Sequence, residues 1–471
     1  MEQKLVYRPQ NMTHNMKYYR IQCIGLDSII VAPFLRIIVD SLSLYDASIY
    51  DRLTMTDIET QIVEMTARAR SAARVLAMAG DEIKAAALKA AAAALRCQGK
   101  QILAANVIDM AAGAASGLSA AMLDRLRLDA DRIEGIALAV DQVAVLTDPV
   151  GKVIDTHTQP NGLVMERVRV PVGVLGIIYE SRPNVTADAA ALGLRSGNAV
   201  ILRGGSEAVN SNRAIHAAMI AGITEAGLPA DAVQLVPTQD RAAVGAMLRA
   251  QGAIDMIIPR GGKSLVARVQ EEARVPVLAH LDGINHTYVH KDADPVMAKA
   301  MVVNAKMRRT GICGATETLL IDEDYDAPAE LVAALIDAGC EVRADDMLME
   351  LDARTVSADD TDWDTEYLDS VISARVVSGL DEAMEHIARH GSHHTDAIIT
   401  GNKVVAARFL AEVDSAIVMH NASTQYADGG EFGLGAEIGI ATGRLHARGP
   451  VALEGLTTYK WLVHGQGQTR P

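Results

Sequence analysis

Aromatic and cysteine residues are both scarce in this sequence. Phe, Trp and Tyr make up 3% of the 471 residues, so Ala, Val, Leu and Ile must build most of the hydrophobic core. The four cysteines, Cys23, Cys97, Cys313 and Cys340, are widely spaced and form no C-x-x-C pair. This spacing is poor evidence for a disulfide framework or a structural zinc site. It favours a reducing, cytoplasmic environment.

A positive net charge and an uninterrupted apolar segment are also lacking. The formal net charge of −15 disfavours binding to nucleic acid or to an anionic membrane, although it leaves room for a local basic pocket. The apolar run at 21–39 contains Asp27 and Arg36, which makes it a poor membrane span. No small-residue cleavage site follows it. We therefore predict neither nucleic-acid nor membrane binding.

The first 54 residues differ in composition from the rest of the chain. They contain only two alanines but six of the 16 aromatic residues. The interpretation we favour is a biological start at Met55, with residues 1–54 as an upstream extension that is disordered or a start-site artefact. The alternative is a genuine amphipathic tail.

The remaining chain predicts two α/β units. Single hydrophobic cores stop growing near roughly 250–300 residues, so at least two domains are expected. Helical patterns at about 57–95 and 119–145 precede two series of alternating strands and helices. The first series ends in a strand predicted at 275–281, and the second series runs from 296 to 419. Such alternation indicates doubly wound parallel sheets, which bind ligands at the carboxyl ends of their strands.

Residues 153–170 alternate weakly between apolar and polar. Asn161-Gly162 in the middle is typical of a hairpin turn. The segment is either a surface hairpin or an arm that pairs with a partner subunit. A final strand is predicted near 456–463.

Two predicted strands end in the same pattern. Arg203-Gly204-Gly205-Ser206 ends one strand, and Arg260-Gly261-Gly262-Lys263 ends another. Paired glycines let the backbone approach a phosphate, and the following helix offers free N–H groups and a positive dipole end. The alternative is two tight turns without a ligand. The basic residues suit a ribose 2′-phosphate better than a free hydroxyl, so NADP(H) is the predicted cofactor.

Cys313 lies in a loop with features of a nucleophile. Gly311 and Gly314 flank it, and Arg308 and Arg309 precede it. Nearby arginines are expected to lower the thiol pKa and enrich the reactive thiolate. A free cysteine is otherwise usually a small buried apolar residue, an interpretation that fits Cys97 and Cys340.

A histidine cluster is the remaining candidate for a metal site. Its members are His386, His390, His393 and His394. We prefer the interpretation that these histidines lie at a helix C-terminus, where histidine is favoured. No carboxylate or cysteine ligand shares their spacing, as a metal site would require. We therefore predict no metal site.

Several long segments occur together in one order. They are Val174–Thr186, Ser196–Ser206, Leu278–Gly283, Gly433–Gly439 and Gly443–Pro450. From Met55 to the end, the chain resembles the gamma-glutamyl phosphate reductases of the aldehyde dehydrogenase superfamily. The resemblance implies an aldehyde-dehydrogenase-like α/β fold: two doubly wound domains and a β oligomerisation arm. The implied parts are an NADP-binding domain at 55–280 with the hairpin at 153–170, a catalytic domain at 281–445, and a C-terminal return and oligomerisation strand at 446–471.

The resemblance also implies roles for single residues. Cys313 matches the catalytic thiol, and Asn184 matches an amide that holds the developing oxyanion. Arg203 matches a residue that contacts the adenosine ribose, and Glu366 matches a glutamate that holds the nicotinamide ribose. The predicted cofactor-binding residues are Arg203, Gly204, Gly205, Ser206, Arg260, Gly261, Gly262, Lys263 and Glu366.

Some positions depart from related patterns. Hydrolytic aldehyde dehydrogenases carry a glutamate base where this chain has His280. Without that carboxylate, water is not readily activated against a thioester, which suits a phosphate-exchanging enzyme. His280 could itself act as a base. Within the family pattern, Thr310 replaces a proline, Gly314 an asparagine and Asn285 a cysteine, which leaves the nucleophile in place.

The reaction that the resemblance implies is the NADPH-dependent reduction of L-glutamyl 5-phosphate to L-glutamate 5-semialdehyde and phosphate, the second step of proline biosynthesis from glutamate. Arg182, Arg309 and Arg444 are candidates for holding the substrate's phosphate and carboxylate. Alternatives are coenzyme A or water as the acyl acceptor, or a nucleotide-binding module without catalysis. The chain has no room for a kinase domain, so glutamate 5-kinase is expected to be a separate, transient partner. The resemblance further implies a homo-oligomer.

Overall fold

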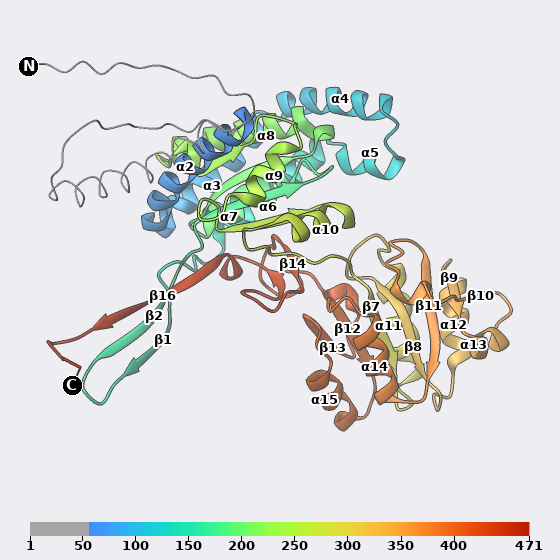
Figure 1. Ribbon diagram of the computed structural model, residues 1–471. Helices are drawn as coiled ribbons and strands as arrows, with labels where there is room; N and C mark the ends of the chain where they lie inside the picture. The colour runs from blue at the N-terminus through green and yellow to red at the C-terminus, as the bar shows by residue number, and fades with distance from the viewer. Residues whose placement is uncertain (1–55, 471) are drawn as a thin grey trace, which may run out of the picture. The chain divides into compact units, whose positions relative to one another are not determined.

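The computed structural model describes residues 56–470 (Figure 1), so the predicted extension at 1–54 and Cys23 lie outside the described residues. The chain begins with helices α2 (Asp57–Met78), α3 (Asp81–Cys97), α4 (Gly99–Ala115), α5 (Ala120–Leu126) and α6 (Ala130–Val145). The continuous helices predicted at 57–95 and 119–145 are each broken, at Gly80 and before the N-cap Asp129, and α4 was not predicted. In residues 56–470, no helix combines the length and apolarity needed to cross a membrane.

Small side chains let these helices pack closely. Ala87, Ala91 and Ala92 of α3 are fully buried. Helix α8 (Val209–Glu225) crosses α3 at Gly222, where a Cβ atom would be 2.1 Å from the backbone nitrogen of Ala91. These helices therefore pack through close approach of their backbones, and they do not need large aromatic side chains to fill the space between them.

The first sheet is parallel and has the order β5-β4-β3-β6. Its strands are β3 (Val174–Tyr179), β4 (Ala199–Gly204), β5 (Val233–Leu235) and β6 (Met256–Arg260), and every residue of β3 and β4 is buried. Helices α7 (Val185–Arg195), α8, α9 (Ala242–Arg249) and α10 (Lys263–Glu272) alternate with the strands.

The strand predicted at 275–281 is wrong. This segment makes only an isolated bridge, between Val277 and Ile257. Pro276 interrupts the run, and proline cannot donate to a strand ladder.

The second sheet has seven parallel strands in the order β10-β9-β11-β8-β7-β12-β13. The strands are β7 (Asn285–Val289), β8 (Thr316–Asp322), β9 (Glu341–Ala344), β10 (Val356–Ser357), β11 (Val371–Val377), β12 (Thr395–Ile399) and β13 (Ile417–His420). The helices between them are α11 (Pro295–Met307), α12 (Pro328–Asp337), α13 (Asp346–Leu351), α14 (Leu380–His390) and α15 (Lys403–Glu412). Two helix-covered parallel sheets agree with the predicted α/β class, while the domain boundaries at 280 and 445 stay predictions.

Strand β7, an interior strand of this sheet, was not predicted from the sequence because its side chains are polar. Asn285, His286 and Thr287 are buried, and each has a hydrogen-bond partner on a neighbouring segment. For example, His286 Nδ1 lies 3.0 Å from a carboxylate oxygen of Asp396 on β12. Buried polar groups are tolerated when they are paired in this way.

A third sheet is antiparallel and joins distant parts of the chain. The hairpin of β1 (Val153–Thr158) and β2 (Val164–Pro171) turns at the predicted position, and β16 (Thr457–His464) pairs along β2 (Figure 1). Tyr459, Trp461 and Val463 of β16 are exposed. A two-stranded sheet, β14 (Gly439–Ala441) with β15 (Gly449–Val451), lies in the Gly-rich segment that precedes β16.

Candidate active site

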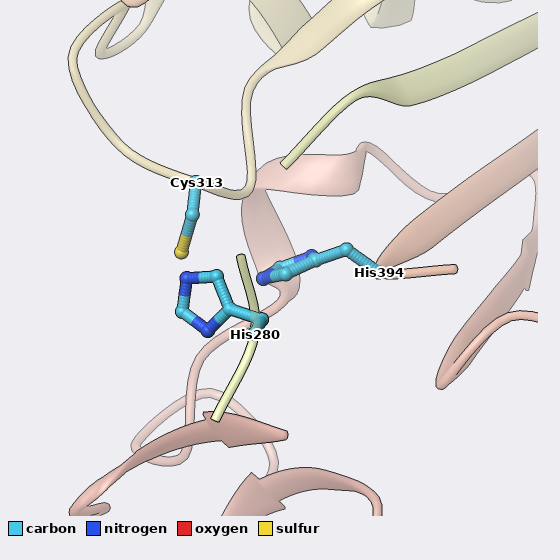
Figure 2. Close-up of side chains that lie close together, drawn as sticks. All are labelled: His280, Cys313 and His394. Atoms are coloured by element: carbon cyan, nitrogen blue, oxygen red, sulfur yellow. The ribbon is translucent and has the colours of Figure 1, made fainter. Parts of the chain in front are cut away.

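Three side chains from separate segments converge on one point. Cys313 lies in the loop between α11 and β8, His280 follows α10, and His394 immediately precedes β12. Figure 2 shows the three side chains facing one another, and their potential ligand atoms all lie within 4.8 Å of each other. The predicted pair of Cys313 and His280 is thus brought together, and His394 joins it unpredicted.

His280 is oriented as a base toward the thiol. Its Nδ1–H donates to the carbonyl oxygen of Ile440, at 2.7 Å, which leaves the lone pair on Nε2. Figure 2 shows the other ring nitrogen directed at the sulfur of Cys313. Burial lowers the pKa of His280, and the nearby Arg260 lowers it further, so the ring is held neutral.

The environment of the thiol differs from the one the sequence predicted. Burial raises the pKa of Cys313 to about 11, against which the positive charge of Arg260 acts. Glu437 and Glu366 also raise this pKa. The expected lowering by the preceding arginines is therefore wrong, because desolvation outweighs the positive charge nearby. A thiol of this kind needs a base, which His280 provides.

Two residues hold the backbone of the cysteine loop. The side-chain amide of Asn285 donates to the carbonyl oxygens of Cys313 (2.6 Å) and Ala315 (2.8 Å), and its own oxygen accepts from Thr395 N–H (3.1 Å). Asn285 is fully buried. Gly283 packs against the same loop, since a Cβ atom there would be 2.2 Å from the carbonyl oxygen of Cys313. Asn285, which replaces a cysteine of the family pattern, thus has a structural role.

The amide of Asn184 lies at the start of α7. It donates to a carboxylate oxygen of Asp188 at 2.8 Å. Burial raises the pKa of Asp188 to about 6, while the bond from Asn184 and the charge of Arg260 lower it. An amide nitrogen carries two donors, so Asp188 orients the group and leaves one N–H for a ligand.

The predicted substrate arginines differ in position. Arg182 lies near enough to Cys313 and Arg260 to interact electrostatically, and burial lowers its pKa. The side chain of Arg309 is exposed, and Arg444 forms an exposed ion pair with Asp414, which also binds Arg448 at 2.7 Å. The substrate roles of Arg309 and Arg444 stay predictions.

Sequence reasoning did not place Arg260 beside the cysteine. Its contact with the cofactor stays a prediction, and its charge also acts on Cys313, Asp188 and His280. Its guanidinium also packs against Gly439, where a Cβ atom would be 2.7 Å from Nη1. Its place at the carboxyl end of a parallel strand was the available signal.

The ends of β4 and β6 have features of an anion site. Gly262 N–H, at the start of α10, donates to a carboxylate oxygen of Glu180 at 3.0 Å, so this helix end already accepts a negative group. Arg203 donates to the carbonyl oxygens of Gly204 and Gln239, both at 2.9 Å. Its buried Nε has no hydrogen-bond partner within the described part of the chain.

Glu366 and Lys263 belong to a charged group near the cysteine loop. Gly283 N–H donates to Glu366 at 2.9 Å, and Lys263 pairs with Asp282 at 2.8 Å. Burial raises the pKa of Glu366. Cofactor contacts for Glu366 and Lys263 stay predictions.

The remaining cysteines of the described chain are not members of the Cys313 cluster. Cys340 is buried in the core of the second sheet, as an inert cysteine should be. Cys97 is exposed, and its expected burial is therefore wrong. It is the last residue of α3 and lies on the solvent side of that helix.

Comparison with known proteins agrees with this architecture. The model of the aldehyde dehydrogenase family matches residues 54–355. The chain belongs to the aldehyde dehydrogenase family. It is 70% identical over 419 residues to the gamma-glutamyl phosphate reductase of Novosphingobium aromaticivorans, covering 89% of this chain and 99% of the relative. The corresponding protein of Zymomonas mobilis is 60% identical over 89% of this chain and 98% of its own length.

Solved structures extend the family comparison. The gamma-glutamyl phosphate reductase of Thermotoga maritima has a TM-score of 0.85 and 43% identity, covering 87% of this chain and 99% of that one. An acetylating aldehyde dehydrogenase from Geobacillus thermoglucosidasius has a TM-score of 0.63 at 16% identity, over 88% and 100% of the two chains, which is a likeness of fold alone. The resemblance to the gamma-glutamyl phosphate reductases, and the aldehyde-dehydrogenase-like fold, are confirmed.

Proposed function

We propose that this chain is an NADPH-dependent gamma-glutamyl phosphate reductase that forms L-glutamate 5-semialdehyde and phosphate through a thioester on Cys313. The observation that carries the proposal is the pairing of the half-buried Cys313 thiol with the neutral His280 ring, beside the charge of Arg260. The names of relatives up to 70% identical support the substrate.

The reaction begins with proton transfer within the Cys–His pair. His280 Nε2 accepts the thiol proton, and the thiolate attacks the carbonyl carbon of the acyl phosphate. The free N–H of Asn184 donates to the developing oxyanion, which disperses its charge. Phosphate leaves with the electron pair of the broken C–O bond, and the acyl group remains on sulfur.

Positive charge favours the departure of phosphate. Arg260 and Arg182 both lie within electrostatic range of Cys313. Guanidinium groups bind phosphate oxygens through paired hydrogen bonds, so they stabilise the leaving group as its charge increases. The proposed role of Arg260 is therefore at the phosphate.

The ends of β4 and β6 fit a phosphorylated dinucleotide. The N-terminus of α10 already accepts a carboxylate, and the partnerless Nε of Arg203 is a donor suited to a ribose phosphate. We propose that Arg203 to Ser206, Gly261 to Lys263 and Glu366 hold the cofactor. NADPH, when bound, supplies the hydride that reduces the thioester. The chain then releases the aldehyde, as Cys313 leaves as thiolate and recovers its proton from His280.

The choice of phosphate over water has a structural basis. The position of the hydrolytic glutamate holds His280, whose lone pair is directed at the sulfur (Figure 2). Once Nε2 holds the thiol proton, the ring has no lone pair with which to activate water against the thioester. An experiment decides whether phosphate or coenzyme A is the acyl acceptor.

The reverse reaction tests the proposal. NADP+ reduction with glutamate 5-semialdehyde is measured with phosphate, with coenzyme A, and with neither, and Cys313→Ala is the negative control. Turnover that requires phosphate and Cys313 supports the proposal. Turnover with coenzyme A alone, or without an added acceptor, would replace it with another activity of the same superfamily.

The proposal includes two protein partners, a second copy of the chain and a kinase. The exposed edge of β16, with Tyr459 and Trp461, is proposed to pair with another copy of the chain. Light scattering at several concentrations would contradict this if it showed only monomer. Glutamate 5-kinase is proposed as a transient partner that delivers the labile acyl phosphate.

A further inference from the structure

The cluster of Cys313, His280 and His394 offers more donors than the reductase needs. One sulfur and two imidazole nitrogens all lie within 4.8 Å of one another (Figure 2). Thiolate and imidazole are the ligands that zinc prefers, whereas magnesium and calcium prefer oxygen. His394 has no part in the proposed reaction, so its presence needs another explanation.

The outer nitrogens of both imidazoles are already engaged. His280 Nδ1 donates to the carbonyl oxygen of Ile440 at 2.7 Å, and His394 Nδ1 lies 2.9 Å from the hydroxyl oxygen of Thr395. Metal-binding histidines are generally oriented by such a bond on the nitrogen that faces away from the metal. In both rings this leaves Nε2 for the cluster.

The Nε2 atom of His394 is the most informative atom of the group. His394 is fully buried, and this nitrogen has no hydrogen-bond partner in the described residues 56–470. The ring meets His280 edge to face, with centroids 5.0 Å apart and an interplanar angle of 79°. Buried polar atoms are normally paired, so an unpaired nitrogen directed at a thiol and a second imidazole points to a missing ligand.

We propose that Cys313, His280 and His394 bind Zn²⁺, and that the bound ion reversibly blocks the nucleophile. Binding forms an S–Zn bond and two N–Zn bonds, and the thiol proton passes to solvent without any change of oxidation state. The proposed inhibition by zinc rests on the proposed function, because it requires Cys313 to be the nucleophile. The proposed binding of zinc does not rest on that function.

The geometry and local charge are compatible with this ion. In a tetrahedral site with usual bond lengths the donor atoms are about 3.3–3.6 Å apart, so the side chains must close by roughly 1 Å. Rotation of the half-buried His280 and Cys313 can provide this closure. Glu366 and Glu437 add negative charge near the sulfur, and Arg260 opposes it. Three protein ligands leave the fourth position for water.

The binding test uses the full chain, reduced and freed of metal by a chelator. Zn²⁺ is titrated by calorimetry, and Co²⁺ is added separately because a cobalt–thiolate bond gives a charge-transfer absorption band. The test variants are Cys313→Ser and His394→Gln, with His280→Gln as a second imidazole variant in case the buried position does not fold. The matched controls are Cys97→Ser, which removes an exposed thiol, and His393→Asn. His393 is exposed and has a φ of 59°, which asparagine tolerates.

The expected result is one Zn²⁺ per chain, with the charge-transfer band present in the wild type and both controls. Loss of an imidazole ligand should weaken binding by at least about 10-fold, and loss of Cys313 should abolish the band. Equal Zn²⁺ affinity in wild type and all imidazole variants, or a wild-type cobalt complex without the thiolate band, would overturn the site. Thermal unfolding identifies any variant that is not folded.

The activity readout separates this inference from the proposed function. Zn²⁺ should inhibit reductase turnover at the concentrations that saturate the calorimetric site, and a chelator should restore it. One-site binding in a protein that shows no reductase activity when metal-free would keep the metal site and remove the proposed function. An active reductase that neither binds Zn²⁺ at Cys313 nor is inhibited by it would do the reverse.

Discussion

Gly283 lies directly against the backbone of Cys313. A Cβ atom at Gly283 would be 2.2 Å from the carbonyl oxygen of Cys313 and 2.9 Å from its Cα. The contact is with backbone on both sides, so no flexible side chain can move to relieve it. The cysteine loop therefore takes its position from a residue thirty places earlier in the sequence.

Gly283→Ala is expected to displace the cysteine loop and to lower kcat strongly while the protein still folds. A displacement of about 1 Å at a reacting group can lower the rate on the order of 100-fold. Steady-state kinetics and circular dichroism provide the measurements. The matched control is Gly135→Ala in α6, where nothing lies within 4 Å of the added Cβ. Full activity of Gly283→Ala would contradict the tight contact.

Asn285→Ala is expected to destabilise the protein and to reduce kcat more than it changes KM. It leaves the carbonyl oxygens of Cys313 and Ala315 without their donor in a buried position. The loss of unfolding free energy should be roughly 1–3 kcal/mol, measured by urea denaturation. Asn304→Ala, an exposed asparagine of α11, is the control. An unchanged kcat would show that the loop is held by other contacts.

Arg182→Gln and Arg260→Gln are expected to raise the KM for phosphate in the reverse reaction by about 10-fold or more, because each removes a charge-assisted contact that we propose for the phosphate. Arg309→Gln should have a smaller effect, since the Arg309 side chain is exposed. Arg260→Gln should also slow alkylation of Cys313 by iodoacetamide, because Arg260 acts to lower the pKa of that thiol. A larger effect at Arg309 than at the other two would reverse the assignment.

His386 is expected to make the protein less stable in mild acid. Burial, followed by the charges of His286 and His390, lowers the pKa of His386 from 6.5 to about 2. The unfolded chain therefore binds a proton between about pH 6.5 and 2 that the folded chain does not, so stability falls as the pH drops through this window. At pH 5 the cost is about 2 kcal/mol relative to neutral pH.

The test compares the unfolding free energy at pH 7 and pH 5 in the wild type and in His386→Leu. The variant should lose less stability between the two pH values, and His157→Gln, an exposed histidine of β1, should behave like the wild type. The readout is a difference between pH values, so a uniform loss of stability does not count. Equal differences in all three proteins would exclude His386 as the source.

Local features of the chain were determined by the sequence alone. The alternation of strands and helices, the hairpin at Asn161-Gly162 and the family of the chain depend on periodicity, turn residues and the order of motifs. The identification of Cys313 and His280 as candidates belongs to this class, because each lies within a recognisable segment. Such features need only neighbours along the chain.

Other features were decided only by the tertiary structure. Strand β7 is polar, and it is stable in the middle of a sheet only because Asp396, Thr316 and other distant partners satisfy it. The run at 275–281 has strand-like residues but finds only a single bridge. The thiol pKa rises because burial, which sequence does not display, outweighs the nearby positive charge.

The residues of the site show the same difference between what the sequence determined and what the tertiary structure decided. Arg260, His394 and Asn285 are 53, 81 and 28 positions from Cys313 in the sequence, yet each acts on it or faces it. No spacing rule links residues so far apart. Arg260 lies at the carboxyl end of β6, whereas Asn285, Cys313 and His394 lie at the amino ends of β7, β8 and β12. Only the packing of the two parallel sheets brings these strand ends together. The sequence alone therefore determined which chemistry was available, and the packing of distant segments decided which residues would share it.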